Sequence, residues 1–363
     1  MPRALALQKA PGSPGKVYYP LRIKEVPKPE PGPGEVLVRL KAAALNHRDY
    51  FIRKHLYPAI SLDNPMLADG YGIVVETGPS VTRPDLLNKP VLLTPNRGWD
   101  SDPAAPEDMR GYTVIGSSAI TEAGTAQDYI VVPEDELVVA PGHLSTAEAA
   151  ALPLAGLTGW RALVTKSGCA SAGKNILITG IGGGVAIQVL QFAVAFGCKV
   201  FVTSGDEGKI DRAKEMGAKG GVSYKDEAWD KKLKELLPKD RPFIDAVIDG
   251  AGGNIVPKSV KLLKPGGVIV QYGMTVSPKM DWTMPAVLSW VDLRGTSMGS
   301  KKEFRDMVAF VGEHKIRPVV SRTVHGLSNL QDIDGLFDDM AQGSQFGKLV
   351  IEIDGEDETQ AKL

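Results

Sequence analysis

The first third of the chain alternates apolar and polar residues in short runs, which Pro and Gly clusters such as PKPEPGPGE (27–35) separate. Alternation with a period of two predicts half-buried β-strands, and the clusters predict the turns between them. A long polar loop, RGWDSDPAAPEDMRG (97–111), is typical of a functional or mobile segment. The predicted strands are EVLVRLKAAAL (35–45), YGIVVETG (71–78), KPVLLTP (89–95) and AQDYIVVP (126–133).

The pattern changes near Ser145, where STAEAAALPLAGLTGWRALV (145–164) predicts a helix. Ser145 and Glu148 have the spacing of a capping box, and Pro153 should break or kink the helix. Strands and helices then alternate over about 130 residues, which predicts a doubly wound parallel sheet. The expected strands are 175–180, 199–204, 220–224, 243–250 and 266–273, and the expected helices are 185–196, 207–217, 228–237 and 254–263.

These patterns predict an α/β protein of two domains. A β-rich domain would comprise 1–144 and 300–363, and a nucleotide-binding domain would comprise 145–299. The chain ends on a further predicted strand, KLVIEI (348–353), followed by DGEDETQAKL (354–363), which we expect to be a frayed acidic tail.

The stretch NILITGIGGGVAIQVLQFAVAF (175–196) is the strongest functional signal. An apolar strand leads into glycines that open a helix, whose N-terminal N–H groups and dipole attract a pyrophosphate. Glycine lets the backbone approach the phosphates closely. Strand, turn, helix and second strand occur in order, so a dinucleotide site is expected. Its predicted residues are Gly180, Gly182, Gly183, Gly184 and Val185.

The second strand indicates which dinucleotide binds. NAD sites carry an acid about twenty residues past the glycines, but this strand ends in Thr203 and Ser204 with no acid at its tip. Ser204 and Lys209 would suit the 2′-phosphate of NADPH, the expected cofactor. If the strand ended two residues later, Asp206 could instead hold the ribose of NAD.

Composition excludes several classes of partner. Hydrophobic residues make up 43% of the 363 residues, which is typical of a globular protein. The 42 basic and 43 acidic residues give a net charge of -1, so neither nucleic acid nor an anionic membrane is an expected partner. The two cysteines, Cys169 and Cys198, predict neither a disulfide framework nor a four-thiolate zinc site, and a reducing, cytoplasmic location is expected.

The domain order resembles the medium-chain dehydrogenase/reductase superfamily, whose first domain is GroES-like and whose second is a Rossmann domain. GEVLVRLKAAALNHRDYFIRKHLYP, PMLADGYGIVVETG, TAEAAALPLAGLTGWRAL, the glycine turn and GKLVI match its quinone-oxidoreductase-like branch. NHRD with GWDSDP is similar to proteins often labelled zinc-type alcohol dehydrogenase-like. The resemblance covers nearly the whole chain and implies a homodimer formed through the nucleotide domains.

The zinc ligands of the superfamily are missing at the matching positions. Asn46 stands where a cysteine would be, and Ala68 and Asp69 replace a His-Glu pair. A catalytic zinc needs three protein ligands, so no metal site is expected, although His47, Asp49 and Asp69 lie near one another in the sequence.

The resemblance implies the roles of further residues. It places Asn46 at the nicotinamide end of the cleft as a donor, Asp49 as a brace or helix cap, and Tyr57 as a second donor. His47 would be a surface or hydrogen-bonded loop residue. The resemblance also assigns cofactor contacts to Thr158, Tyr224, Gly273, Met274 and Lys348, the last either at the phosphates or flanking an edge strand.

The expected function is a zinc-independent, NADPH-dependent oxidoreductase that transfers hydride to a quinone or an α,β-unsaturated carbonyl. Two alternatives stay open: an enoyl-thioester reductase, and a non-catalytic NADPH-binding sensor. An alcohol dehydrogenase is disfavoured because the zinc ligands are missing.

Overall fold

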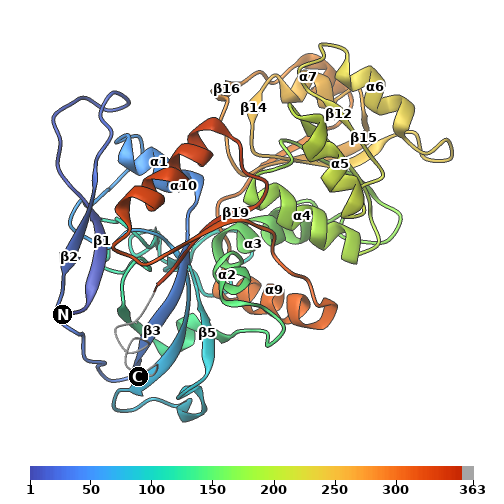
Figure 1. Ribbon diagram of the computed structural model, residues 1–363. Coiled ribbons are helices and arrows are strands. Elements are labelled where there is room, and N and C mark those ends of the chain that lie inside the picture. Colours follow the sequence, from blue (N-terminus) through green and yellow to red (C-terminus); the bar gives the residue numbers. More distant parts are fainter. Residues whose placement is uncertain (354–363) are drawn as a thin grey trace. The chain divides into compact units, whose positions relative to one another are not determined.

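The protein, described by a computed structural model over residues 1–353, forms two compact units (Figure 1). The first unit comprises 1–154 together with the segment from Ser300 onwards, and the second comprises 155–299. The expected acidic tail (354–363) lies outside the described residues. The structure places the first boundary ten residues later than expected, because α2 (Thr146–Ala150) packs through Ala150 on Ala42 and Ala44 of the first unit.

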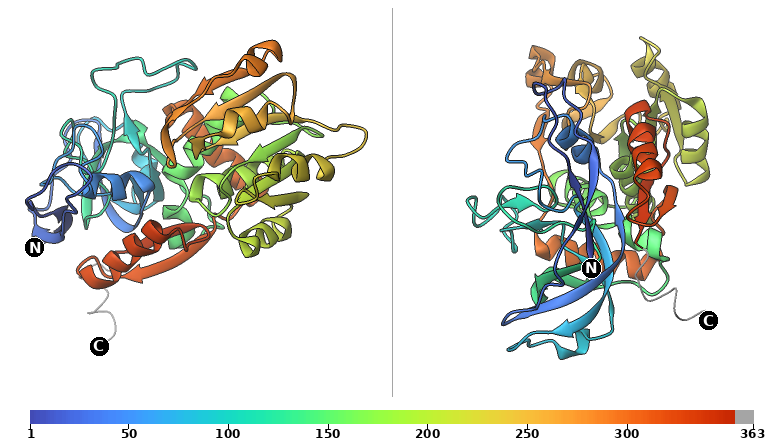
Figure 2. Two further views of the ribbon diagram at one scale, coloured as in Figure 1. Left: turned by 90° about the horizontal axis from the view of Figure 1, so that it is seen from above. Right: turned by 60° about the vertical axis from the view of Figure 1, so that its left-hand side comes forward.

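The first unit is built on a seven-stranded sheet, and the strands predicted in the first third of the chain are present. β3 (Glu35–Ala44) runs antiparallel to β4 (Asp69–Thr77), as Figure 2 shows in blue and cyan. β19 (Lys348–Glu352) pairs with β3 on one side and with β18 (Val320–His325) on the other. The sheet is completed by β5 (Pro90–Leu93), β9 (Leu137–Val139) and β8 (Tyr129–Pro133), and two small sheets are formed by β1 (Arg3–Leu7) with β2 (Leu21–Glu25) and by β6 (Asn96–Arg97) with β7 (Thr113–Val114).

The helices of this unit are short at the N-terminal end and longer at the C-terminal end. They are α1 (His47–Arg53), α2, α9 (Lys301–His314) and α10 (Leu330–Gln342), with 3₁₀ turns at Pro84–Leu86 and Glu134–Glu136. Ser145 accepts from the Glu148 backbone N–H at 3.3 Å and donates its own to the Glu148 carboxylate at 2.8 Å, which confirms the predicted capping box. As predicted, Pro153 breaks the helical stretch: α2 ends at Ala150 and α3 begins at Pro153.

The second unit carries the doubly wound sheet. Its six strands are all parallel, in the order β12-β11-β10-β13-β15-β17. Counted along the chain this is 3-2-1-4-5-6, the order of dinucleotide-binding domains. The strands are β10 (Asn175–Ile178), β11 (Lys199–Ser204), β12 (Gly220–Ser223), β13 (Ile244–Asp249), β15 (Leu263–Gln271) and β17 (Asp292–Gly295), with the small pair β14 (Gly252–Gly253) and β16 (Ser277–Met280).

Helices connect these strands close to the predicted positions. They are α3 (Pro153–Trp160), continued by a π-helical turn (Arg161–Lys166), α4 (Gly184–Ala195), α5 (Glu207–Glu215), α6 (Trp229–Leu236), α7 (Ile255–Ser259) and α8 (Met284–Leu288). Throughout residues 1–353, no helix is long and apolar enough to cross a membrane.

Arg53 fixes α1 to α10 within the first unit. Its side chain is only 2% exposed, and its guanidinium donates to Asp334 at 2.6 Å and to the Tyr19 carbonyl at 2.9 Å. The guanidinium carbon also lies 4.0 Å from the centre of the Tyr18 ring and 4.6 Å from that of Phe337. This cation therefore contributes through packing as well as charge.

We predict that Arg53→Met lowers the free energy of unfolding by about 2–3 kcal/mol, because it leaves a buried carbonyl without its donor and loosens the contact between α1 and α10. Arg22→Met is the matched control, since the Arg22–Asp63 pair is exposed and should contribute less than about 1 kcal/mol. Urea unfolding followed by circular dichroism measures both. Equal losses in the two variants would contradict this role of Arg53.

Candidate functional site

A buried ion pair lies at one end of the strands of the first unit. The Lys348 ammonium donates three hydrogen bonds: to Asp69 Oδ2 at 2.7 Å, to Asn46 Oδ1 at 2.6 Å and to the Leu45 carbonyl at 2.6 Å. Asn46 Nδ2 also donates to Asp69 Oδ2, at 2.8 Å. The Lys348 and Asp69 side chains are 4% and 0% exposed, so this is an internal ion pair with its hydrogen bonds largely satisfied.

The register of the sheet brings these three residues together. Asp69 begins β4 and lies opposite Ala44 at the end of β3, and Val350 of β19 also lies opposite Ala44. Asn46 follows β3 directly as the N-cap of α1. The other Asp69 oxygen accepts the Leu154 backbone N–H at 2.5 Å. Three segments distant in sequence therefore meet at one carboxylate.

The structure corrects one expectation for Lys348, that it flanks an edge strand, while its contact with the cofactor phosphates stays a prediction. All three of its N–H donors are used inside the first unit. β19 is not an edge strand, because it is hydrogen-bonded on both sides. Lys348 completes the network around Asp69.

The stretch ALNHRDYF (44–51), from the end of β3 into α1, is a capped helix start. Asp49 is fully buried and accepts from the Asn46 backbone N–H at 2.8 Å and from Arg48 at 3.3 Å, so it acts as a cap and brace. Burial raises the pKa of Asp49 to about 6. His47 is exposed, and its ring centre lies 4.7 Å from that of Phe51.

Tyr57, expected to be a donor, lies half-buried under a cation. The Arg48 guanidinium carbon is 4.9 Å from the centre of its ring. The same guanidinium donates to the carbonyls of Ile115 and Gly116 at 2.9 and 3.1 Å. Arg48 therefore ties the start of α1 to a second loop, a contact that sequence reasoning missed.

The residues of the first unit do not fit a catalytic zinc. Among residues 1–353 no group of three or more His, Cys, Asp or Glu side chains lies close enough to hold a metal ion. The Asp69 carboxylate is already bonded to an ammonium, and Asn46 and Ala68 supply no anionic or imidazole ligand beside it. Asn46 and Asp69, which the resemblance matched to zinc-site positions, are instead bonded to Lys348.

The glycine turn of the second unit fits a pyrophosphate. Gly180 and Gly182 have φ values of 61° and 126°, which favour glycine. A Cβ on Gly180 would meet nothing within 4 Å, so the turn is open there. Gly183 is the N-cap of α4, with no side-chain cap, and Gly184 and Val185 begin the helix. The first backbone N–H groups of α4 therefore remain for an anion.

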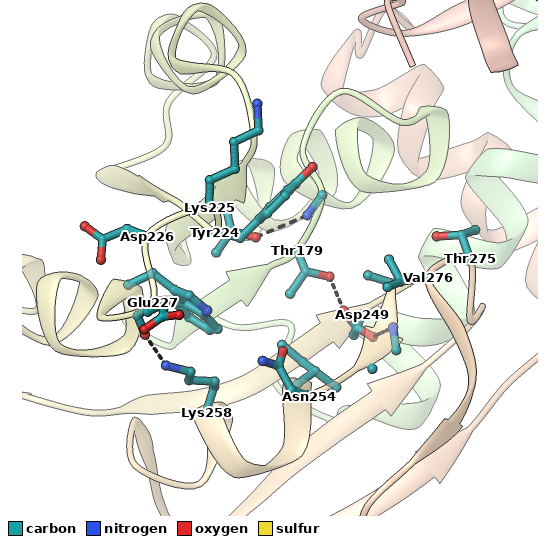
Figure 3. A pocket seen from close by; sticks show the side chains of 17 residues that line it. Thr179, Tyr224, Lys225, Asp226, Glu227, Asp249, Asn254, Lys258, Thr275 and Val276 are labelled. Atoms are coloured by element: carbon teal, nitrogen blue, oxygen red, sulfur yellow. Dashed lines mark hydrogen bonds between the residues drawn. The ribbon is translucent and has the colours of Figure 1, made fainter. Parts of the chain in front are cut away.

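A pocket of about 640 Å³ adjoins this turn at the carboxyl end of the sheet, and Figure 3 shows its lining. Asp249, at the end of β13, is fully buried there and accepts from Thr179 Oγ1, from the Gly252 backbone N–H at 2.7 Å and from Gln271 at 2.6 Å. Sequence reasoning did not select Asp249, although an acid at the carboxyl end of a parallel strand is a visible signal.

The tip of β11 shows where Ser204 and Asp206 lie. The strand ends at Ser204, and Asp206 Oδ1 caps α5 by accepting from the Gly208 backbone N–H at 2.8 Å and that of Lys209 at 3.3 Å. The Lys209 side chain lies against the turn, because a Cβ on Gly182 would be 2.8 Å from its Cδ. Partial burial lowers the pKa of Lys209. Tyr224 lines the pocket and is 53% exposed.

The remaining predicted cofactor residues lie in the second unit. Thr158 is buried in α3 with its hydroxyl 3.8 Å from the Met298 sulfur. Gly273 and Met274 follow β15 at its carboxyl end, where the Gly273 carbonyl accepts from Gln271.

The comparisons with known proteins agree with this architecture. The alcohol dehydrogenase GroES-like domain model matches residues 32–142, and the zinc-binding dehydrogenase model matches residues 184–313. The chain is 58% identical over 358 residues to the zinc-type alcohol dehydrogenase-like protein YogA of Leptosphaeria maculans, covering 97% of this chain and 100% of that protein.

Two further relatives cover nearly the whole chain. An acryloyl-coenzyme A reductase of Sulfurisphaera tokodaii is 26% identical, covering 91% of this chain and 96% of that protein. A crystal structure of an NAD-dependent alcohol dehydrogenase has 32% identity and a TM-score of 0.81, covering 97% of this chain and 100% of that one. The chain therefore belongs to the zinc-type alcohol dehydrogenase-like family of the medium-chain dehydrogenase/reductase superfamily.

Proposed function

We propose that this protein is a zinc-independent, NADPH-dependent oxidoreductase that reduces a conjugated carbonyl, either a quinone or an α,β-unsaturated ketone or aldehyde. The observation that carries the proposal is the Lys348–Asp69–Asn46 network, which includes two residues, Asn46 and Asp69, that the resemblance matched to zinc-site positions. A member of this family without those ligands needs another source of positive potential beside its substrate.

The network supplies that potential locally through the Asn46 amide, because the Lys348–Asp69 pair itself has no net charge. Asn46 uses one amide hydrogen on Asp69, and its second hydrogen is a donor for a substrate oxygen. The Lys348 ammonium on the Asn46 carbonyl oxygen polarises the amide and makes it a better donor. The nicotinamide, when bound, supplies the hydride. A reduced quinone can take its proton from water, so no strong general acid is required.

The proposed choice of NADPH rests on the tip of β11. Asp206 is engaged as a helix cap, and no acid ends the strand. In our proposal the Ser204 hydroxyl and the Lys209 ammonium bind the 2′-phosphate. The related NAD-dependent alcohol dehydrogenase shows that this family also includes users of NAD, so the preference requires a direct measurement.

A thioester acceptor is the second candidate, and the related acryloyl-coenzyme A reductase favours it. Reduction of an enoyl thioester uses the same hydride transfer to a conjugated carbonyl, so the same donor at Asn46 would serve. A direct comparison of acceptors separates the two candidates.

We also propose a homodimer that pairs the second units through β17. This strand is hydrogen-bonded to β15 on one side only, and all four of its residues are exposed. Large apolar side chains surround it: Leu288, Trp290 and Leu293 are 65%, 73% and 41% exposed. A free edge strand beside exposed apolar side chains is a template for strand pairing.

Purified protein should oxidise NADPH rapidly with a small quinone or with cyclohexenone, followed by nicotinamide absorbance. We expect kcat/KM for NADPH to exceed that for NADH by at least about tenfold, because the 2′-phosphate gains ionic contacts. Acryloyl-CoA, supplied in parallel, should be a poorer acceptor. Turnover of acryloyl-CoA alone would favour the thioester function, and tight binding without turnover would favour a sensor.

Lys348→Met should lower kcat/KM by about 100-fold, because the Asn46 amide loses its polarising charge. It should also cost about 3 kcal/mol of stability, since it leaves Asp69 buried without a counter-ion. The double variant Lys348→Met/Asp69→Asn removes both charges and should regain stability while remaining slow. The NADPH Kd should stay within about twofold of the parent value. A large increase in this Kd would instead indicate that Lys348 contacts the cofactor phosphates.

Leu293→Asp should convert the dimer to monomers in sedimentation velocity runs, because it puts a charge in the proposed β17 interface. Leu236→Asp is the matched control: Leu236 is 45% exposed on α6, away from that edge, and the variant should remain dimeric. A parent protein that sediments as a monomer would overturn the proposed assembly.

A further inference from the structure

A second lysine, which the motifs did not select, lies beside the tip of β11. Lys225 directly follows Tyr224 in the segment between β12 and α6, and both line the pocket of the second unit (Figure 3). The Tyr224 backbone N–H donates to the Ser204 carbonyl at 3.0 Å, which fixes this segment against the end of β11.

Gly205, the first residue after β11, makes room for both side chains. A Cβ at this position would be 2.7 Å from the Tyr224 hydroxyl and 3.0 Å from Lys225 Cε. In the glycine turn, a Cβ on Gly182 would meet the Lys209 side chain. Tyr224 and Lys225 therefore lie against the backbone just past Ser204, and Lys209 lies against the glycine turn.

Lys225 has no neighbouring counter-ion among the described residues. Its side chain is exposed and makes no ion pair with any carboxylate in the part of the chain that the structure describes. The adjacent Asp226 is bonded to Lys232 and to the Ala228 backbone N–H, and Asp206 is occupied as the cap of α5. Of the two nearby aspartates, Asp226 has Lys232 as its counter-ion, which leaves the Lys225 ammonium available to an anion at this tip.

We infer that Lys225 is a specificity-determining residue that binds the 2′-phosphate of NADPH together with Lys209. A phosphate monoester carries close to two negative charges at neutral pH, so a second cation adds to what one lysine provides. The inference rests on the proposed NADPH dependence and adds the residue that discriminates against NADH.

The test is the Kd of the full-length protein for NADPH and for NADH, measured by quenching of tryptophan fluorescence. Lys225→Gln should raise the NADPH Kd about tenfold and leave the NADH Kd within about twofold. Lys231→Gln is the matched control, because Lys231 is an exposed lysine of α6 that does not line the pocket. It should change neither constant.

Gly205→Ala gives an independent test that keeps both lysines. Its φ is not in the left-handed region, so alanine is compatible with the backbone, and the methyl group would displace the ends of Tyr224 and Lys225. We expect a normal melting temperature, a weaker NADPH complex and an unchanged NADH complex.

The outcomes separate this inference from the proposed function. If the parent protein binds NADH as tightly as NADPH, the proposed cofactor preference fails and the role of Lys225 fails with it. If the parent prefers NADPH and Lys225→Gln keeps that preference in full, only the role of Lys225 is overturned. A selective loss of NADPH affinity supports both.

Discussion

The buried ion pair of Lys348 and Asp69 organises the first unit. It joins the start of β4, the start of β19 and the turn between β3 and α1, three segments that only the folded sheet brings together. Burying two charges carries a desolvation penalty, which is offset only when the geometry and the additional hydrogen bonds are good. The Asn46 amide, the Leu45 carbonyl and the Leu154 backbone N–H supply those bonds.

Because of this ion pair, the fold and the chemistry have to be argued separately in a family whose name refers to zinc. The two domain models and the relatives establish the fold and the membership of the family. Membership of the family does not assign a metal or a substrate, and function has to be argued from the site. The Lys348 ammonium places one positive charge on the Asn46 carbonyl oxygen, within an ion pair that has no net charge. In our proposal that charge acts through Asn46 on the oxygen of the acceptor.

The sequence predicted much of the fold because its signals are local. Period-two alternation located β3, β4, β5 and β8, the capping box at Ser145 and the break at Pro153 were both readable, and the glycine turn marked the start of α4. The boundary between the units was misplaced, because α2 has a helical pattern but belongs to the first unit through contacts with Ala42 and Ala44. Nothing local in the sequence encodes that packing.

The site was harder to predict than the fold. Asn46, Asp69 and Lys348 were each noticed, but their joint hydrogen bonds depend on strand register across about 300 residues of sequence, so the pairing of Lys348 with Asp69 was missed. Asp249 carried a signal that can be read from the sequence, an acid at the end of a predicted strand, but it was not selected. Lys225 had none, because its position over Gly205 arises from the pairing of β12 with β11.

The most direct test of this account is the metal content of the active protein. Zinc would be measured by plasma mass spectrometry on protein dialysed against a chelator, alongside its rate of NADPH oxidation with a quinone. We predict far less than one zinc per chain together with full activity. One zinc per chain, with activity that falls as the metal is removed and returns when it is restored, would contradict the central claim.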